Sequence, residues 1–252
     1  MPTRTAVADP QRRGSWLFTL WVAGCLLVTM PPASLGVLLL RDRAAVDRLV
    51  RGWSRLVVRL SRCRVSVDGL EHAQTNAMFV SNHASYLDSI LFLAKLPLDF
   101  RFVAHHEAVS WPLVGRALRK SGHIVVNRGS ARSRHDSFIQ MKAQLAAGGA
   151  VLVYPEGRRG GRELLPFRSG AFRAAADTGC RVVPMTITGT SRLLPPGSML
   201  LSRSPIAIQL LPPCQAADAG RQAADELRER TQALIAASLR SETAGPRQTR
   251  IT

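Results

Sequence analysis

Short apolar segments alternate with longer helical segments through most of the chain, and this alternation restricts the fold more than any other feature. Residues 77–81 and 150–154 are apolar almost throughout, as expected for strands buried on both faces of a sheet. Residues 133–147 and 219–239 have the composition of helices. Strands that alternate with helices predict an α/β fold. We therefore predict a single α/β domain, residues 44–240, with a mixed, largely parallel sheet flanked by helices.

An N-terminal hydrophobic segment, residues 16–40, contains no charged residue and has arginines on both sides. It exceeds the ~20 residues that a membrane-spanning helix needs. Pro31 and Pro32 interrupt it, so it predicts either one kinked spanning helix or a hairpin that dips into one leaflet, and the flanking arginines favour the hairpin. A cleaved signal peptide is the alternative, but the segment is long for one. We predict a membrane anchor over residues 1–43 and a flexible tail over residues 241–252.

The formal net charge is +17, with 34 basic and 17 acidic residues. Such an excess favours a polyanionic partner, either nucleic acid or anionic lipid. Directly after the apolar segment, residues 44–62 place arginines between apolar residues at helical spacing. That pattern is typical of a helix on an anionic membrane surface and equally of an ordinary packed helix. The four cysteines lack metal-ligand spacing, so we expect them reduced and predict no metal site.

The first candidate site directly follows the apolar segment 77–81, where the sequence reads Asn-His-Ala-Ser-Tyr-Leu-Asp. The end of a strand that leads into a helix is a common ligand site in α/β proteins. We expect Asn82 to cap the helix and His83 to lie in its first turn, which would keep the imidazole neutral. Asp88 could then reach back to one ring nitrogen and fix the tautomer, as in the base and orienting residue of a catalytic triad. No nucleophilic side chain completes the set, which suits a reaction whose substrate brings its own hydroxyl.

Further charged residues follow other predicted strands. An arginine on a loop that follows a strand, such as residues 154–159, can hold a phosphate through paired hydrogen bonds. Glu156 on that loop could hold an arginine or bind a glycerol hydroxyl. Taken singly, each arginine is more often a solvated surface charge. The candidate substrate-binding residues are Arg128, Glu156, Gly157, Arg158 and Arg159.

Other enzyme classes fit the sequence less well. A serine hydrolase of the G-x-S-x-G type fails because residues 189–193 end in leucine. A zinc protease fails because no second histidine follows His106-Glu107 at the required spacing. The remaining alternative from a different class is a non-catalytic basic protein that binds membranes. The apolar anchor does not favour a nucleic-acid partner.

Together these motifs resemble those of the glycerolipid acyltransferase family, specifically the bacterial 1-acylglycerol-3-phosphate acyltransferases. The motifs that carry the resemblance lie at residues 82–88, 122–128, 154–159 with 165–167, and 183–187. The third motif departs from the usual Glu-Gly-Thr-Arg-Ser, because Arg158 replaces the threonine and Gly160 the serine.

The resemblance implies an acyltransferase that moves a fatty acyl group from an acyl-CoA or acyl carrier protein thioester to the sn-2 hydroxyl of lysophosphatidic acid. It implies His83 as the base, Asp88 as its partner, and Arg128, Glu156, Gly157 and Arg159 at the glycerol phosphate. No cofactor is needed beyond the acyl thioester co-substrate. The expected partners are a lysophospholipid acceptor, an acyl thioester donor carried by CoA or by an acyl carrier protein, and an anionic membrane. The expected location is the cytoplasmic face of a bacterial inner membrane. Because of the altered third motif, lyso-ornithine lipid is an alternative acceptor.

Overall fold

The computed structural model describes residues 15–160, 163–194 and 198–243. The strands are β1 (Val65–Asp68), β2 (Ala77–Ser81), β3 (Arg101–His105), β4 (Ile124–Val126), β5 (Val151–Val153), β6 (Arg181–Thr188) and β7 (Ile206–Leu210). The α-helices are α1 (Trp16–Leu39), α2 (Arg43–Leu60), α3 (Leu87–Lys95), α4 (His106–Ser110), α5 (Pro112–Lys120), α6 (Ala131–Ala146), α7 (Gly170–Thr178), α8 (Thr190–Leu193) and α9 (Arg221–Thr243), and a 3-10 turn covers Leu70–His72.

The strands form one seven-stranded sheet in the order β1-β7-β6-β2-β5-β3-β4. Neighbouring strands are parallel throughout except for β6 and β7, which are antiparallel. This confirms the predicted mixed, largely parallel sheet. Strand β2 is the central strand, and its residues are all buried because helices cover both faces of the sheet.

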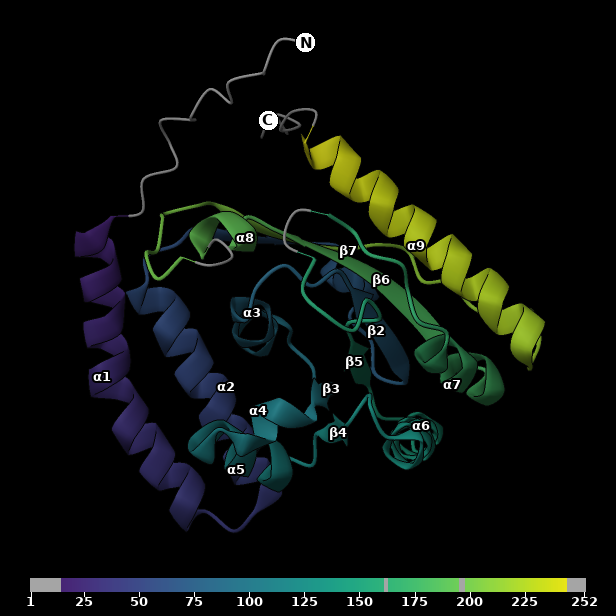
Figure 1. Ribbon diagram of the computed structural model, residues 1–252, viewed down its shortest axis with the longest axis horizontal. Helices are drawn as coiled ribbons and strands as arrows, with labels where there is room; N and C mark the ends of the chain where they lie inside the picture. The colour runs from purple at the N-terminus through teal and green to yellow at the C-terminus, as the bar shows by residue number, and fades with distance from the viewer. Residues whose placement is uncertain (1–14, 161–162, 195–197, 244–252) are drawn as a thin grey trace.

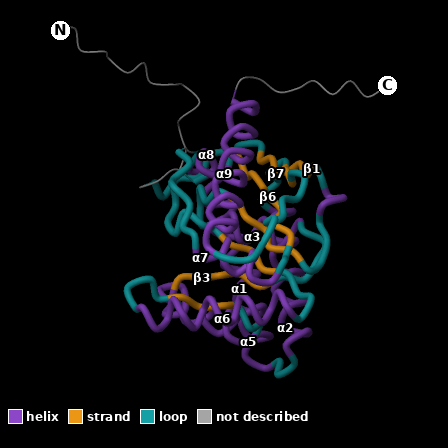
Figure 2. Tube along the Cα trace, turned by 90° about the vertical axis from the view of Figure 1, so that its right-hand side faces the viewer, coloured by secondary structure: helices purple, strands orange, loops and turns teal. Residues whose placement is uncertain are grey.

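Two apolar clusters fill the spaces between the sheet and its helices. Successive side chains of β2 point to opposite faces, so Phe79 joins one cluster while Met78 and Val80 join the other. Helices α1, α2 and α3 lie on the Phe79 side, and α6, α7 and α9 lie on the opposite side (Figure 1). Figure 2, which is viewed from the α9 side, shows α9 and α7 in front of the strands. The sheet is therefore the middle layer of three.

Helix α1 is a single helix that includes Pro31 and Pro32, so the hairpin reading of this segment does not hold. Its inner side packs along α2, where a side chain at Gly36 would collide with Leu49. The indole of Trp53 in α2 donates to the Thr29 hydroxyl of α1 at 3.2 Å. Continuous packing on a neighbouring helix supports the chain through the prolines, which lack the N–H that the helix would otherwise use.

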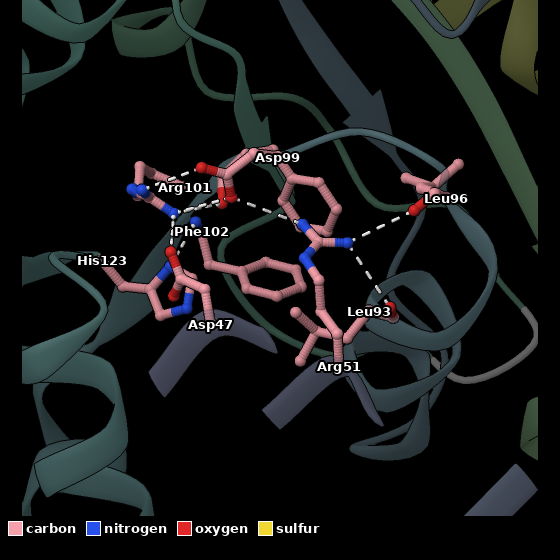
Figure 3. Close-up of polar contacts among 9 residues, drawn as sticks. Asp47, Arg51, Leu93, Leu96, Asp99, Arg101, Phe102 and His123 are labelled. Carbon is pink, nitrogen blue, oxygen red and sulfur yellow. Dashed lines mark hydrogen bonds and ion pairs between the residues drawn. The ribbon is translucent and has the colours of Figure 1, made fainter. Parts of the chain in front are cut away.

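A partly buried ion-pair network attaches α2 to the rest of the domain (Figure 3). The Arg101 side chain, at the start of β3, donates to Asp47 of α2 at 3.0 Å and to both carboxylate oxygens of Asp99 at 2.9 and 3.0 Å. Arg51 of α2 lies 3.6 Å from Asp99 and donates to the Leu96 carbonyl oxygen at 3.3 Å. Asp47 and Arg51 of α2 therefore face the domain, as in an ordinary packed helix, whereas Arg55 and other arginines of α2 are exposed.

The C-terminal boundary differs from the prediction. Helix α9 continues to Thr243, so residues 241–243, which we predicted to begin a flexible tail, are helical. The remainder of the predicted tail and residues 1–14 of the predicted anchor lie outside the described residues.

Candidate active site

A tight loop carries His83 from the end of the central strand β2 to helix α3. The carboxylate of Asp88, in the first turn of α3, organises this loop. Its Oδ2 atom accepts hydrogen bonds from the backbone N–H groups of Ala84 at 2.8 Å and Ser85 at 2.9 Å. The same atom lies 2.8 Å from His83 Nδ1. One buried carboxylate therefore fixes both the loop and the imidazole.

The imidazole of His83 is held on its edge and on one face. An ionised carboxylate only accepts hydrogen bonds, so Nδ1 carries the proton that faces Asp88 and Nε2 retains its lone pair. The ring of Tyr154, which follows β5, stacks on the imidazole with centroids 4.0 Å apart and planes 14° apart. Burial and the negative charge of Asp88 raise the pKa of Tyr154 well above its usual value, so the phenol is neutral. The ring of His83 has little freedom to rotate.

Two predictions about the start of this helix were wrong. Helix α3 begins at Leu87, so His83 lies in the preceding loop and not in the first helical turn. Asn82 does not cap the helix. Its side chain instead bonds both backbone groups of Ile187 in β6, accepting from the N–H at 2.9 Å and donating to the carbonyl oxygen at 3.0 Å. The amide side chain ties two neighbouring strand ends together, and Asp88 supplies the capping interactions.

Glu156 connects the loop after β5 to the backbone of His83. Its Oε1 accepts from the His83 N–H at 2.7 Å and its Oε2 from the Leu165 N–H at 2.8 Å. The N–H of Gly160 donates to the His83 carbonyl oxygen at 2.9 Å. Burial raises the pKa of Glu156, and the two backbone hydrogen bonds oppose that rise. The sequence predicts that this carboxylate holds an arginine or a glycerol hydroxyl; in the structure its two oxygens instead accept from the backbone N–H groups of His83 and Leu165.

Two glycines allow this loop to pass close to its neighbours. Gly157 has a φ of 75°, in the left-handed region, and a Cβ there would lie 2.7 Å from the Nε of Arg168. A Cβ at Gly160 would collide with the carbonyl oxygen of Glu163 and lie 2.8 Å from Glu156 Oε2. The glycine at 160, where the resembling family has serine, therefore fits the path that this loop takes.

The candidate arginines are distributed unequally around the histidine. The guanidinium of Arg159 lies 3.6 Å above the ring of Tyr86, which belongs to the same loop as His83. Arg158 is exposed, and among the described residues no hydrogen bond or ion pair joins it to the rest of the site. The structure thus brings Arg159 to the histidine loop and leaves Arg158 facing solvent.

Arg168 is not among the predicted substrate-binding residues, although it lies on the loop that carries the third motif. Desolvation lowers the pKa of Arg128, the positive charge of Arg168 lowers it further, and Glu107 raises it. Arg128 and Arg168 are therefore close enough to repel each other, and Arg168 also lies against Gly157. Arg168 directly follows the third motif, but nothing in its spacing separated it from a solvated arginine. Two like charges brought together next to the Gly157 loop form a surface suited to an anionic substrate.

Comparisons with known proteins identify the family of the chain. Residues 64–188 match the family model described as acyltransferase. The chloroplastic 1-acyl-sn-glycerol-3-phosphate acyltransferase of Arabidopsis thaliana is 37% identical over 140 residues, which cover 54% of this chain and 39% of that protein. The 1-acyl-sn-glycerol-3-phosphate acyltransferase of Salmonella typhimurium is 24% identical over 180 residues, which cover 69% of this chain and 70% of that protein. The matches to the first plant and algal relatives span less than half the length of those relatives.

The fold is also that of a solved acyltransferase. The crystal structure of the 1-acyl-sn-glycerophosphate acyltransferase PlsC from Thermotoga maritima superposes with a TM-score of 0.76 at 22% identity, and the match covers 92% of this chain and 97% of that one. The matched family segment includes β2, the histidine loop and the Glu156 loop. By its family match, its relatives and its fold, this chain belongs to the acyltransferase family.

Proposed function

We propose that this protein transfers a fatty acyl group from a thioester to the sn-2 hydroxyl of 1-acyl-sn-glycerol 3-phosphate, giving phosphatidic acid. The observation that carries the proposal is the oriented His83–Asp88 pair, with 2.8 Å between Nδ1 and Oδ2, on a loop whose Tyr86 ring lies under the guanidinium group of Arg159. Several relatives are named for this activity, including bacterial ones. The exposed or half-buried cations match an acceptor that carries a phosphate.

In the proposed mechanism, the lone pair on Nε2 of His83 takes the proton of the acceptor hydroxyl as that oxygen attacks the thioester carbonyl carbon. Asp88 holds Nδ1–H and stabilises the imidazolium that forms. The carbon–sulfur bond then breaks, and the thiolate leaves and takes up the proton from His83. Thiols have a pKa of about 8.5, so the leaving group needs little assistance from an acid. The step requires neither a covalent enzyme intermediate nor a metal or other cofactor.

Arg128, Arg159 and Arg168 bind the phosphate of the acceptor in this proposal. Arg159 is held over Tyr86, and the mutual repulsion of Arg128 and Arg168 is relieved when a doubly charged phosphate lies between them. Glu156 and Gly157 support this site through the backbone, and Arg158 lies at its exposed rim. The donor is a thioester of coenzyme A or of an acyl carrier protein, both of which are anionic.

We also propose that α1 attaches the protein to the cytoplasmic face of a bacterial inner membrane by lying along it. Helix α1 is apolar enough to cross a membrane, and its outer side is largely exposed. Both of its ends are bound to the domain, at the start by the Ser15 N–H donating to the Leu201 carbonyl oxygen at 3.0 Å, and at the end by Lys120 Nζ donating to three carbonyl oxygens at 2.7–2.9 Å. With 24 residues α1 is about 36 Å long. Because α2 packs along it, a bilayer-spanning α1 would also place the charged residues of α2 in the hydrocarbon region, which is costly. Insertion of the exposed face into one leaflet avoids that cost.

The test is a thiol-release assay on the purified protein with acyl-CoA and acyl carrier protein donors and with lysophosphatidate and lyso-ornithine lipid as competing acceptors. His83→Ala should abolish nearly all turnover, while the matched variant His135→Ala, which changes an exposed histidine on α6, should retain it. Retained turnover in a folded His83→Ala protein would refute the role of the base.

The phosphate site is tested by the KM for lysophosphatidate. Arg128→Ala and Arg159→Ala should raise it, because the positive charge that binds the phosphate is removed. Arg181→Ala, an exposed residue at the opposite end of the sheet where β6 begins, is the control. If lyso-ornithine lipid were the preferred acceptor, the assignment of a phosphate-bearing acceptor would be wrong.

A further inference from the structure

A cavity lies at the start of α1, and none of the residues of the His83 site lines it. Its volume is about 550 Å³, within the range of roughly 300–1,000 Å³ typical of ligand pockets. It is bounded by the first turns of α1, by Arg62 just after the C-cap of α2, and by the segment before β7. The lining residues that matter here are Ser15, Phe18, Trp21, Arg62, Ser202 and Arg203.

Two arginines face this cavity against aromatic side chains. The guanidinium carbon of Arg62 lies 5.6 Å from the centre of the Trp21 ring, and that of Arg203 lies 5.1 Å from the centre of the Phe18 ring. Within the described part of the chain, no ion pair joins either arginine to a carboxylate. A guanidinium group presents several N–H donors in one plane, which match the oxygens of a phosphate. The cavity therefore offers two cations with unused donors to an anion.

Arg62 occupies a backbone position that favours glycine. It directly follows Ser61, the C-cap residue of α2, and has a φ of 53°, in the left-handed region. Helices commonly end with glycine in this conformation because other residues are strained there. Strained residues are retained mainly where their side chains have a function. The left-handed turn directs the Arg62 side chain over Trp21 and into the wall of the cavity.

The cavity lies where lipid headgroups would meet the protein. Trp16 and Trp21, at this end of α1, are 62% and 46% exposed, and tryptophan is enriched at the headgroup level of membranes. We propose that this cavity binds the phosphate of an anionic membrane phospholipid that is neither the acyl acceptor nor the product. The proposal rests on the placement of α1 at the bilayer surface. A soluble phosphate ester has the same binding group, but the apolar surroundings of the two arginines favour a lipid.

Flotation of the full-length protein with vesicles tests the proposal at fixed ionic strength. The vesicles contain phosphatidylcholine alone or phosphatidylcholine mixed with phosphatidylglycerol. The site variant combines Arg62→Gly, which relieves the backbone strain and so preserves folding, with Arg203→Gln. The control variant combines Arg55→Gln with Arg59→Gln, which removes the same charge from exposed positions of α2. A parallel measurement offers sn-glycerol 3-phosphate in the absence of vesicles.

The wild-type protein should prefer the vesicles that contain phosphatidylglycerol. The site variant should lose that preference by about fivefold for each arginine, or roughly 25-fold in all, and the control variant should lose clearly less. Equal losses in the two variants would overturn the proposal in favour of diffuse surface charge. Binding of glycerol 3-phosphate that the site variant abolishes would overturn the lipid assignment. If the wild-type protein bound neither kind of vesicle, the placement of α1 would fail too, whereas the thiol-release assay in detergent would still test acyl transfer.

Discussion

Replacing Glu156 with glutamine tests whether this carboxylate positions the histidine or binds the substrate. The carboxylate accepts from two backbone N–H groups, those of His83 at 2.7 Å and Leu165 at 2.8 Å, and only 4% of the residue is exposed. A glutamine side chain has one carbonyl oxygen, which can accept from one of these N–H groups, and one NH₂ group, which cannot accept from the other. One backbone N–H therefore loses its acceptor and faces the new NH₂ group.

The magnitude follows from these contacts. A hydrogen bond to a charged group contributes about 1.5–3 kcal/mol, and a buried donor left unpaired costs a similar amount. We expect Glu156→Gln to lower the free energy of unfolding by about 2–4 kcal/mol, which a domain of ordinary stability of about 5–15 kcal/mol survives. Because the His83 backbone shifts, kcat should fall, by about 10²-fold for a displacement of about 1 Å. The KM for the acceptor should change little.

The assay combines urea unfolding with thiol release over a range of acceptor concentrations. Glu163→Gln is the matched control, because Glu163 is an exposed residue on the same loop. If Glu156 bound a glycerol hydroxyl, the variant would raise KM and leave kcat near that of the wild type. That result, or unchanged stability, would refute the positioning role.

Three further perturbations test other parts of the structure. Burial lowers the pKa of His123 from 6.5 to about 3. Between these two pH values the unfolded chain binds a proton on this imidazole and the folded protein does not, so the free energy of unfolding falls as the pH falls below 6.5. Urea unfolding should therefore show a stability loss of about 1.4 kcal/mol per pH unit below 6.5, and His123→Asn, which keeps an acceptor for the Phe102 N–H, should lack it. Tyr154→Phe should keep most of kcat while Tyr154→Leu lowers it, since only the latter loses the stacked ring; equal losses would contradict a role for stacking. Arg101→Met should lower the free energy of unfolding in urea by about 3–5 kcal/mol, because the Asp47 carboxylate loses its partner. Adding Asp47→Leu should restore part of that free energy. If the effects of the two substitutions were additive, the direct pairing of the two side chains would be contradicted.

Much of the architecture could be predicted from local patterns. Fully apolar segments such as 77–81 indicated strands covered on both faces, and the helices between them indicated parallel connections. The junction between β2 and α3 placed an imidazole and a carboxylate five positions apart, close enough for one turn of chain to bring them together. Local geometry was sufficient because all the atoms involved belong to one short segment.

The rest of the candidate site was decided by the tertiary structure. Glu156 bonds the backbone of His83 across 73 residues of sequence, and Tyr154 stacks on the imidazole, because β5 lies next to β2 in the sheet. Strand order depends on how the helices pack over the sheet, which no single segment encodes. The same limit applies to α1, whose length and prolines allowed a hairpin or a helix until its packing along α2 selected one. Sequence periodicity determines what each segment can form, whereas the burial of apolar faces against one another determines which segments meet.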